Sequence, residues 1–306
     1  MGIEKCLIGG LPSSIFHSRP IEDGPEKYHS KLFVFVAGNP GLIEFYEPFL
    51  SGIQQNNPQW EILGISHAGM NTCDTFHCPV YTLQEQINHK IEVINNYSDK
   101  TRHLIIMGHS VGAYMVQKIL LSPQLNGMVL RVGLLTPTVI DIHKSEKGTK
   151  LTRLNRWIPH FHVVVATVAY VIFEKLLPTY ITSLIASTMV DNIDSSVGMA
   201  TMSLISNSRF VKQALGLAAE EMQVIRSDWA FQDSFLSHCQ SRNIKIWFLF
   251  SQKDHWVSPE TCKDLIKFFK SHSDPKMLEI DVSPTLEHAF VRRHAEVVIR
   301  EYFGQV

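Results

Sequence analysis

The stretch IIMGHSVGAYM, residues 105–115, decides the fold because it begins as a strand and ends as a helix, with a serine at the change. Its centre, GHSVG, fits the pattern Gly-x-Ser-x-Gly, in which a sharp turn holds a nucleophilic serine. Glycines on both sides allow close backbone approach, and the amino end of a helix favours a developing negative charge. A turn that merely uses a serine is the alternative, but the strand–turn–helix context favours Ser110 as a nucleophile.

Strand-like and helix-like patterns alternate on both sides of this turn. Short apolar runs predict buried strands at residues 31–38, 61–66, 102–108, 128–137, 243–251 and 276–282. Apolar residues at helical spacing predict helices at residues 82–97, 111–121, 259–272 and 290–303. This order predicts an α/β fold, a mostly parallel sheet with helices on both faces.

The alternation stops for about a hundred residues, where helical or irregular patterns prevail. We therefore expect a first part of the α/β core at residues 1–137, a mainly helical cap at 138–241 and a second part of the core at 242–306. The cap is expected over the carboxyl edge of the sheet, which is where open α/β sheets bind ligands.

A serine hydroxyl needs a base that removes its proton, and the chain has 15 histidines. His288 follows the last predicted strand, so we expect it on a loop at the same edge as Ser110. His294 falls within the final predicted helix, and His272 ends a helix on the far side. His109 is next to the serine, but its side chain is expected to point away from the hydroxyl. His288 is therefore the predicted base.

The base in turn needs a carboxylate that orients the imidazole and stabilises its charged form. Asp254 lies directly after the predicted strand 243–251, on a loop at the correct edge. Asp141 is the alternative, because some proteins of this architecture take the acid from the preceding strand. It lies four residues beyond Pro137, inside the predicted cap, so the loop position favours Asp254. We interpret His255 as a loop residue rather than a second base.

The negative oxygen that forms when a serine attacks a carbonyl needs two backbone N–H donors. Val111, the residue after the serine, is expected to supply one. The turn AGNPG at residues 37–41, after the first predicted strand, is expected to supply the other. Because Pro40 has no N–H, Asn39 is the predicted donor and Gly38 the second choice.

With these features in place, the chain resembles an α/β-hydrolase. It is similar, over nearly its whole length, to the lipid droplet-associated hydrolase family. The motifs that carry this resemblance are VAGNPGLIEFYEPFL (36–50), GHSVGAYM (108–115), SQKDHWV (251–257) and LEHAFV (286–291). The resemblance implies a serine esterase fold, residence on lipid droplets and the cytosolic face of the endoplasmic reticulum, and a role in cholesterol ester and neutral lipid turnover. It carries the roles of nucleophile, acid and base to Ser110, Asp254 and His288.

The predicted cap has the most unusual composition of the chain. Residues 143–157 carry five basic side chains and one acidic one, and two apolar runs follow at 161–173 and 176–190. Each run is too short for a simple spanning helix, but the pair suits insertion into a phospholipid interface. We expect the phospholipid monolayer of a lipid droplet as the partner. The alternative is a lid that folds its apolar face over the active site.

The overall composition argues against several classes of protein. Apolar residues make up 45% of the chain and charged residues 19%, which fits a folded globular protein. The net charge of −1 gives no basis for binding nucleic acid. The five cysteines include no CxxC pair, and their odd number argues against a disulfide framework. No group of residues has metal-ligand spacing, and we expect neither a metal nor an organic cofactor.

The amino-terminal sequence MGIEKC begins like a myristoylation signal but has Cys6 where Ser or Thr is needed, so we interpret it as a chance match. It lacks the basic start and apolar core of a secretory signal. The leading hypothesis is therefore hydrolysis of lipid carboxylic esters, cholesteryl ester or another neutral lipid, through an acyl-enzyme on Ser110. The alternatives are a droplet-surface scaffold with little turnover and a soluble esterase for small esters or thioesters.

Overall fold

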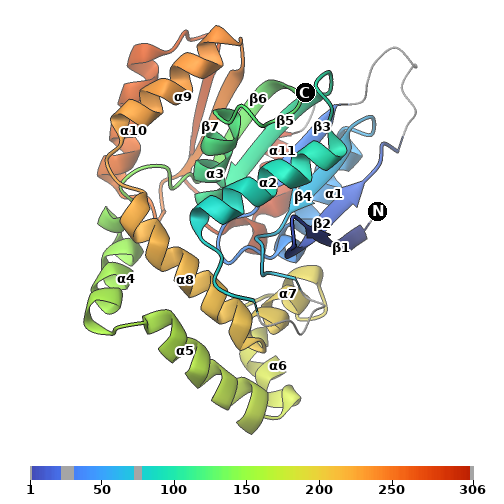
Figure 1. Ribbon diagram of the computed structural model, residues 1–306, viewed down its shortest axis with the longest axis vertical. Helices are drawn as coiled ribbons and strands as arrows, with labels where there is room; N and C mark the ends of the chain where they lie inside the picture. The colour runs from blue at the N-terminus through green and yellow to red at the C-terminus, as the bar shows by residue number, and fades with distance from the viewer. Residues whose placement is uncertain (1, 22–30, 72–77, 304–306) are drawn as a thin grey trace.

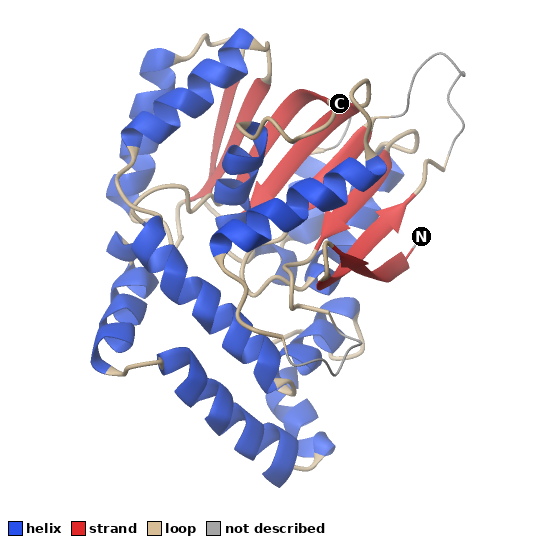
Figure 2. Cartoon of the chain, viewed as in Figure 1, coloured by secondary structure: helices blue, strands red, loops and turns tan. Residues whose placement is uncertain are grey.

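The computed structural model describes residues 2–21, 31–71 and 78–303. An eight-stranded sheet of order β1-β2-β4-β3-β5-β6-β7-β8 forms its centre, with helices on both faces (Figures 1 and 2). The strands are β1 (Gly2–Ile8), β2 (Leu11–Ser18), β3 (Leu32–Val36), β4 (Glu61–Ile65), β5 (His103–His109), β6 (Met128–Leu135), β7 (Lys245–Ser251) and β8 (Leu278–Ser283). Strands β3 to β8 pair in parallel, so the predicted mostly parallel sheet is confirmed.

Helices connect the later strands and follow the last one. The α-helices are α1 (Glu47–Asn56), α2 (Leu83–Tyr97), α3 (Val111–Leu120), α4 (Glu146–Trp157), α5 (Phe161–Ala169), α6 (Thr179–Ser187), α7 (Ser196–Ile205), α8 (Ser208–Val224), α9 (Trp229–Ser241), α10 (Pro259–His272) and α11 (Ala295–Tyr302). The shorter or wider turns are η1 (Ile43–Tyr46), η2 (Ile142–Lys144), the π-helix η3 (Tyr170–Leu176) and η4 (Phe290–Arg292).

Alternating side chains of the buried strands build two separate apolar layers. In β3, Val34 points into a layer shared with α2, α3, α9 and α10, whereas Phe33 and Phe35 point into a layer shared with α1 and α11. Because both faces are covered, the strand is apolar at every position, as parallel strands usually are. The helices therefore hold the sheet rigid from both sides, and the loops at its carboxyl edge are anchored on a fixed frame.

An antiparallel hairpin of β1 and β2, which is not among the predicted strands, forms one edge of the sheet. Its two strands pair from Gly2 with His17 to Ile8 with Leu11, and β2 continues antiparallel onto β4. Gly9 and Gly10, both with positive φ, make the two-residue turn. A Gly-Gly pair between two strand-like runs is a hairpin signal, so the sequence contained the information.

The final helix is shorter than predicted. The expected helix over 290–303 is broken into η4 and α11, because Arg293 and His294 have non-helical dihedral angles. The break allows both Phe290, which contacts Phe49 edge-on, and Val298 to pack into the apolar layer that contains α1.

Helices α4 to α8 lie together beyond one end of the sheet (Figure 1). α8 is the central helix of this group, since α4, α5 and α7 all pack against it. In contrast, α9 returns to the sheet and buries Phe235, Leu236 and Cys239 in the layer of α3 and α10. Among the described residues, no single helix is long and apolar enough to cross a bilayer; one pair, Glu146–Trp157 and Phe161–Leu176, meets the criteria jointly but is bent by 94°.

Candidate active site

Ser110 lies at the tight turn between β5 and α3. Its backbone has φ 55° and ψ −123°, a strained conformation that is common at functional turns. A Cβ on Gly108 would collide with the backbone of Gly112, and a Cβ on Gly112 would collide with the carbonyl of Val36. The two glycines therefore permit a turn that larger residues would block, and the Ser110 side chain lies at a site only 7% exposed.

His288 and Asp254 extend from Ser110 as a continuous line of hydrogen bonds. The distance from His288 Nε2 to Ser110 Oγ is 2.9 Å, and the distance from His288 Nδ1 to Asp254 Oδ2 is 2.8 Å. A carboxylate accepts and does not donate, so His288 carries its proton on Nδ1 and its Nε2 accepts from the serine hydroxyl. The structure brings together three residues that are separated by up to 178 positions in the sequence.

The loop after β7 fixes the carboxylate of Asp254. Its second oxygen, Oδ1, accepts hydrogen bonds from the backbone N–H groups of Trp256 at 2.7 Å and Val257 at 3.0 Å. The side chain is nearly completely buried. All three bonds favour a single orientation of the carboxylate, which in turn orients the imidazole of His288.

Asp141, the alternative acid, has different partners. Its carboxylate accepts hydrogen bonds from Lys144 Nζ at 2.8 Å and Ser227 Oγ at 2.5 Å. Burial alone would raise the pKa of Asp141, but these two hydrogen bonds, together with the electrostatic effects of Lys144 and His143, lower the pKa. Asp141 therefore joins the start of the cap to the loop between α8 and α9, while Asp254 contacts the histidine.

His109 links the serine turn to the loop that carries His288. Its Nε2 lies 2.8 Å from the carbonyl oxygen of His288, which can only accept, so Nε2 is the protonated nitrogen. Burial, followed by the nearby His288, lowers the pKa of His109 to about 3, and the ring is neutral. Its Nδ1 therefore accepts from the hydroxyl of Tyr46 at 2.6 Å. The side chain lines the same cavity as Ser110, but its nitrogens are directed at Tyr46 and a backbone oxygen rather than at Ser110 Oγ.

The turn at residues 37–41 lies against Ser110, as expected for a second oxyanion donor. A Cβ on Gly38 would be 3.0 Å from Ser110 Cβ. The N–H of Gly38 donates to the Tyr46 hydroxyl at 2.9 Å, so it is already engaged. Among the described residues, the N–H of Asn39 has no acceptor. Val111 begins α3, and the first N–H groups of a helix have no acceptor within it.

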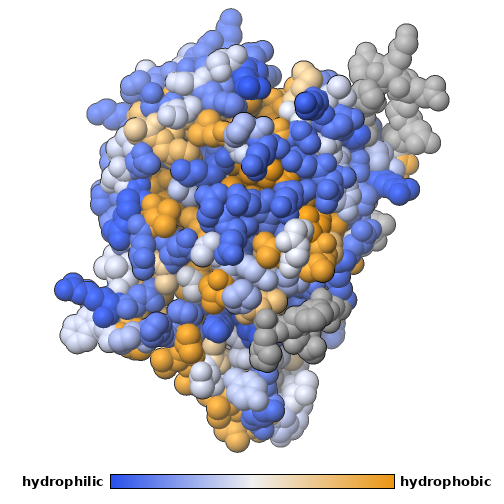
Figure 3. Space-filling view, viewed as in Figure 1, coloured by the Kyte–Doolittle hydropathy of each residue, from blue (hydrophilic) through white to orange (hydrophobic). Residues whose placement is uncertain are grey.

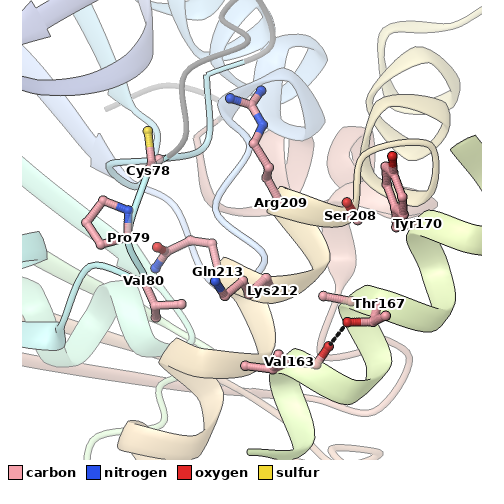
Figure 4. Close-up of a pocket in the computed structure, with 12 residues that line it drawn as sticks. Cys78, Pro79, Val80, Val163, Thr167, Tyr170, Ser208, Arg209, Lys212 and Gln213 are labelled. Carbon is pink, nitrogen blue, oxygen red and sulfur yellow. Dashed lines mark hydrogen bonds between the residues drawn. The ribbon is translucent and has the colours of Figure 1, made fainter.

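A cavity of about 410 Å³ opens beside Ser110 and His288. One wall is apolar and comes from the cap, with Leu204, Ile205, Val211, Leu215 and Ala218. A second cavity, of about 250 Å³, lies between the loop at 78–80, α5 and the start of α8 (Figure 4). Neither Ser110 nor His288 lines that second cavity. In the described ranges, no group of three or more His, Cys, Asp or Glu side chains could hold a metal ion.

Tyr46→Phe is expected to destabilise the protein and slow its reaction with a serine-directed probe. The change leaves the N–H of Gly38 and Nδ1 of His109 buried without their hydroxyl partner, which costs about 1–3 kcal/mol. Urea unfolding measures that loss, and probe labelling measures a fall of about tenfold if the two turns loosen. Tyr180→Phe is the matched control, because Tyr180 is exposed on α6. Unchanged stability and labelling in Tyr46→Phe would show that the hydroxyl link is unimportant.

Solved structures with this fold include enzymes of several kinds. The haloalkane dehalogenase DbeA from Bradyrhizobium elkani has a TM-score of 0.66 and 12% identity, covering 99% of this chain and 96% of that one. A structure from Nitrososphaera gargenis, described in a study of carboxylesterases, has a TM-score of 0.60 and 10% identity, covering 98% of this chain and 97% of that one. At such identities the likeness shows the fold alone, and it confirms the predicted α/β-hydrolase fold.

Proteins with similar sequences point to a more specific family than the structural similarities do. Proteins named "Lipid droplet-associated hydrolase" from Homo sapiens and Drosophila melanogaster are 25% and 26% identical to this chain. The human alignment covers 94% of this chain and 89% of the human protein. The Drosophila alignment covers 97% and 96%. The model of the family described as "Lipid-droplet associated hydrolase" matches residues 29–291, which include the serine turn and both of its hydrogen-bonded partners, and the chain therefore belongs to the lipid droplet-associated hydrolase family.

Proposed function

We propose that this protein hydrolyses carboxylic esters of lipids, with Ser110 as the nucleophile, His288 as the base and Asp254 as the orienting acid. The observation that carries the proposal is the line of hydrogen bonds from Asp254 through His288 to Ser110, which ends in a largely apolar cavity. A serine hydroxyl within hydrogen-bond reach of an oriented histidine is the arrangement that activates it. Membership of the lipid droplet-associated hydrolase family supports hydrolysis as the reaction class.

The reaction would follow two steps. Ser110 Oγ attacks the ester carbonyl carbon while its proton passes to His288 Nε2, and the N–H groups of Val111 and Asn39 stabilise the oxyanion. The C–O bond to the alcohol then breaks, and the alcohol leaves with the proton from His288. Water then gives a proton to His288 and attacks the acyl carbon, the bond from that carbon to Ser110 Oγ breaks to release the fatty acid, and His288 returns the proton to Ser110 Oγ.

The cavity supports a long acyl chain as the part of the substrate that binds beside the serine. Its cap-side residues are aliphatic, and burying such a chain contributes about 0.8 kcal/mol per CH₂ group. Cholesteryl ester or another neutral lipid supplies such a chain. We propose these esters as the substrate class.

The experiment that tests the reaction is labelling of the purified protein by a fluorophosphonate probe, with and without phospholipid-coated oil droplets. An activated serine reacts with the probe, so wild type should label and Ser110→Ala should not. Ser271→Ala, an exposed serine on α10, is the control and should label like wild type. If wild type remains unlabelled under both conditions, the hydrolase proposal fails and the droplet-surface scaffold becomes the better explanation.

We further propose that the cap binds the phospholipid monolayer of the lipid droplet and the cytosolic face of the endoplasmic reticulum, the two locations that the family resemblance implies. Apolar residues are visible at the lower tip of the molecule, over α5 and α6 (Figure 3). Large apolar side chains exposed on the cap include Trp157, Val164, Val168, Leu176, Tyr180 and Leu184. An exposed apolar surface of this kind, next to the basic helix α4, is typical of proteins that bind lipid interfaces.

The double variant Leu176→Glu/Leu184→Glu is expected to bind droplets at least about tenfold more weakly than wild type. Each leucine is more than 60% exposed, at 69% and 67%, so the change removes apolar area that would enter the monolayer. Burying one such side chain contributes about 1.5–3 kcal/mol. Flotation with phospholipid-coated droplets measures the bound fraction.

Leu7→Glu is the control for this experiment. Leu7 is 69% exposed, like Leu176, but lies on β1 at the edge of the sheet rather than on the cap. It should float like wild type. Equal flotation of the double variant and wild type would instead favour the alternative, a cap that closes only over the active site.

A further inference from the structure

A buried acid in the wall of the catalytic cavity has no role in the reaction described so far. Glu221, on α8, is 3% exposed and lines the cavity that contains Ser110 and His288. Carboxyl groups are rarely buried without a partner. The partner of Glu221 is therefore the first question to ask of it.

That partner is Asn39, the residue proposed above as the second oxyanion donor. Asn39 Nδ2 donates to Glu221 Oε1 at 2.8 Å and to the backbone carbonyl of Ala214 at 2.9 Å. An amide nitrogen has two hydrogens, so both are used on α8. The loop after β3 is thus tied to the cap helix through one side chain, and the cap contributes directly to the geometry of the site.

We propose that Glu221 is a positioning residue: its carboxyl holds the side chain of Asn39 and thereby fixes the backbone N–H that would bind the oxyanion. The inference rests on the proposed hydrolase function and adds a residue to it. A displacement of about 1 Å at a catalytic group can cost about a hundredfold in rate. A hydrogen bond that prevents such movement has an effect on turnover larger than its own strength suggests.

The charge state of Glu221 follows from its surroundings. Burial raises its pKa to about 8, with a smaller contribution from the negative charge of Glu220, while the hydrogen bond from Asn39 acts in the opposite direction. The group is therefore mostly neutral at pH 7 and ionises at higher pH. An ionised carboxylate in the wall of the cavity would oppose the negative charge that develops on the substrate oxygen.

Other ionisable groups lie around α8. Across the cavity lie His109 and His288, both already hydrogen bonded. The elements that pack against α8 are α2, α4, α5, α7 and η2. Their ionisable residues, with Asp141 before η2, are Glu85, His89, Lys90, Glu92, Tyr97, Asp141, His143, Lys144, Glu146, Lys147, Lys150, Arg153, Arg156 and His162. The charge that contributes to the pKa of Glu221 is that of Glu220, its neighbour on α8 itself.

Two substitutions separate the hydrogen bond from the charge. Glu221→Gln keeps an oxygen that accepts from Asn39 but cannot ionise, whereas Glu221→Leu removes the acceptor. Hydrolysis of p-nitrophenyl octanoate, measured between about pH 5 and pH 10, gives kcat and KM for each protein. Gln223→Leu, an exposed position on the same helix, is the control.

We expect Glu221→Leu to lower kcat by about tenfold or more with little change in KM, because the oxyanion donor is less well placed only in the transition state. Glu221→Gln should retain most of the kcat at pH 7. It should also lack the fall in kcat that wild type shows as the pH rises through about 8. Wild-type kcat in Glu221→Leu, or an unchanged alkaline fall in Glu221→Gln, would overturn the inference.

A thermal measurement tests the ionisation without any turnover. A carboxyl whose pKa is raised from 4.5 to about 8 stabilises the folded state fully below pH 4.5, and this contribution is lost as the pH rises through about 8. The Tm of Glu221→Gln relative to wild type should therefore increase between these values. A constant difference would show that Glu221 is already ionised at neutral pH.

Fluorophosphonate labelling of wild type separates the proposed hydrolase function from the proposed role of Glu221. No labelling rejects the hydrolase function itself, whereas labelling with a wild-type kcat in Glu221→Leu rejects only the role of Glu221.

Discussion

His288→Ala is expected to lower kcat/KM for ester hydrolysis by about 10⁵-fold, because the serine hydroxyl loses the base that takes its proton. Nε2 of His288 contacts Ser110 Oγ at 2.9 Å, and the hydroxyl has no other base within the described hydrogen-bond network. The residual rate would come from the oxyanion donors and substrate binding alone. Stopped assays of fatty acid release, with phospholipid-coated droplets as the substrate surface, measure the loss.

The structure indicates that this variant keeps its local fold. The carbonyl oxygen of His288, which accepts from His109 Nε2 and Thr136 Oγ1, belongs to the backbone and remains after the substitution. His255→Ala is the control, because His255 is exposed and pairs with Glu146 rather than with Ser110. Turnover near wild type in His288→Ala, or a comparable loss in His255→Ala, would reject the assignment of the base.

Asp254→Asn is expected to lower kcat by about 10⁴-fold while leaving the protein folded. An amide in place of the carboxylate can present its NH₂ group to His288 Nδ1, which favours the wrong tautomer and leaves Nε2 protonated. Nε2 can then no longer accept the serine proton. The hydrogen bonds from Trp256 and Val257 to Oδ1 can persist with an amide oxygen, so the loop should retain its shape.

Asp141→Asn is the control for Asp254→Asn. The two acids are well matched, because both side chains are buried and both follow neighbouring strands. Asp141 contacts Lys144 and Ser227 rather than His288, so its substitution should change kcat by no more than a few fold. Any larger effect is expected on thermal stability, measured by Tm. Equal losses of kcat in the two variants would contradict the distinction between them.

Local sequence patterns were sufficient to predict the turn and the loops on which the site residues lie. The strand and helix patterns around Ser110 predicted its turn, and the ends of the last two parallel strands predicted the loops of Asp254 and His288. The positions of these loops can be predicted because parallel strands place their carboxyl ends at one edge, whatever their separation in the chain. The family motifs point to the same three positions, and the structure brings those side chains into contact.

Side-chain contacts between distant segments could not be predicted from local sequence patterns. The link from Gly38 through Tyr46 to His109 depends on how one loop packs against another, and no spacing rule predicts it. The contact of Glu221 with Asn39 joins residues 182 positions apart across the cavity. On the sequence, Glu221 is an ordinary acid on an amphipathic helix. The hairpin of β1 and β2 is a different case, since its Gly-Gly turn was a visible signal.

The point at which the cap leaves and rejoins the sheet has an evolutionary consequence. The chain departs after Leu135 at the end of β6 and returns with α9, which leads into β7, the strand next to β6. Without the intervening helices, β6, α9 and β7 would still form a complete strand–helix–strand unit, with Leu135 paired to Leu249. Recombination can therefore exchange one cap for another while the sheet and the loops that carry Ser110, Asp254 and His288 are inherited, and the contact of Glu221 with Asn39 is lost with the original cap. A chimaera that carries a foreign cap on this sheet would keep the serine, histidine and aspartate in place and acquire the surface preference of its donor.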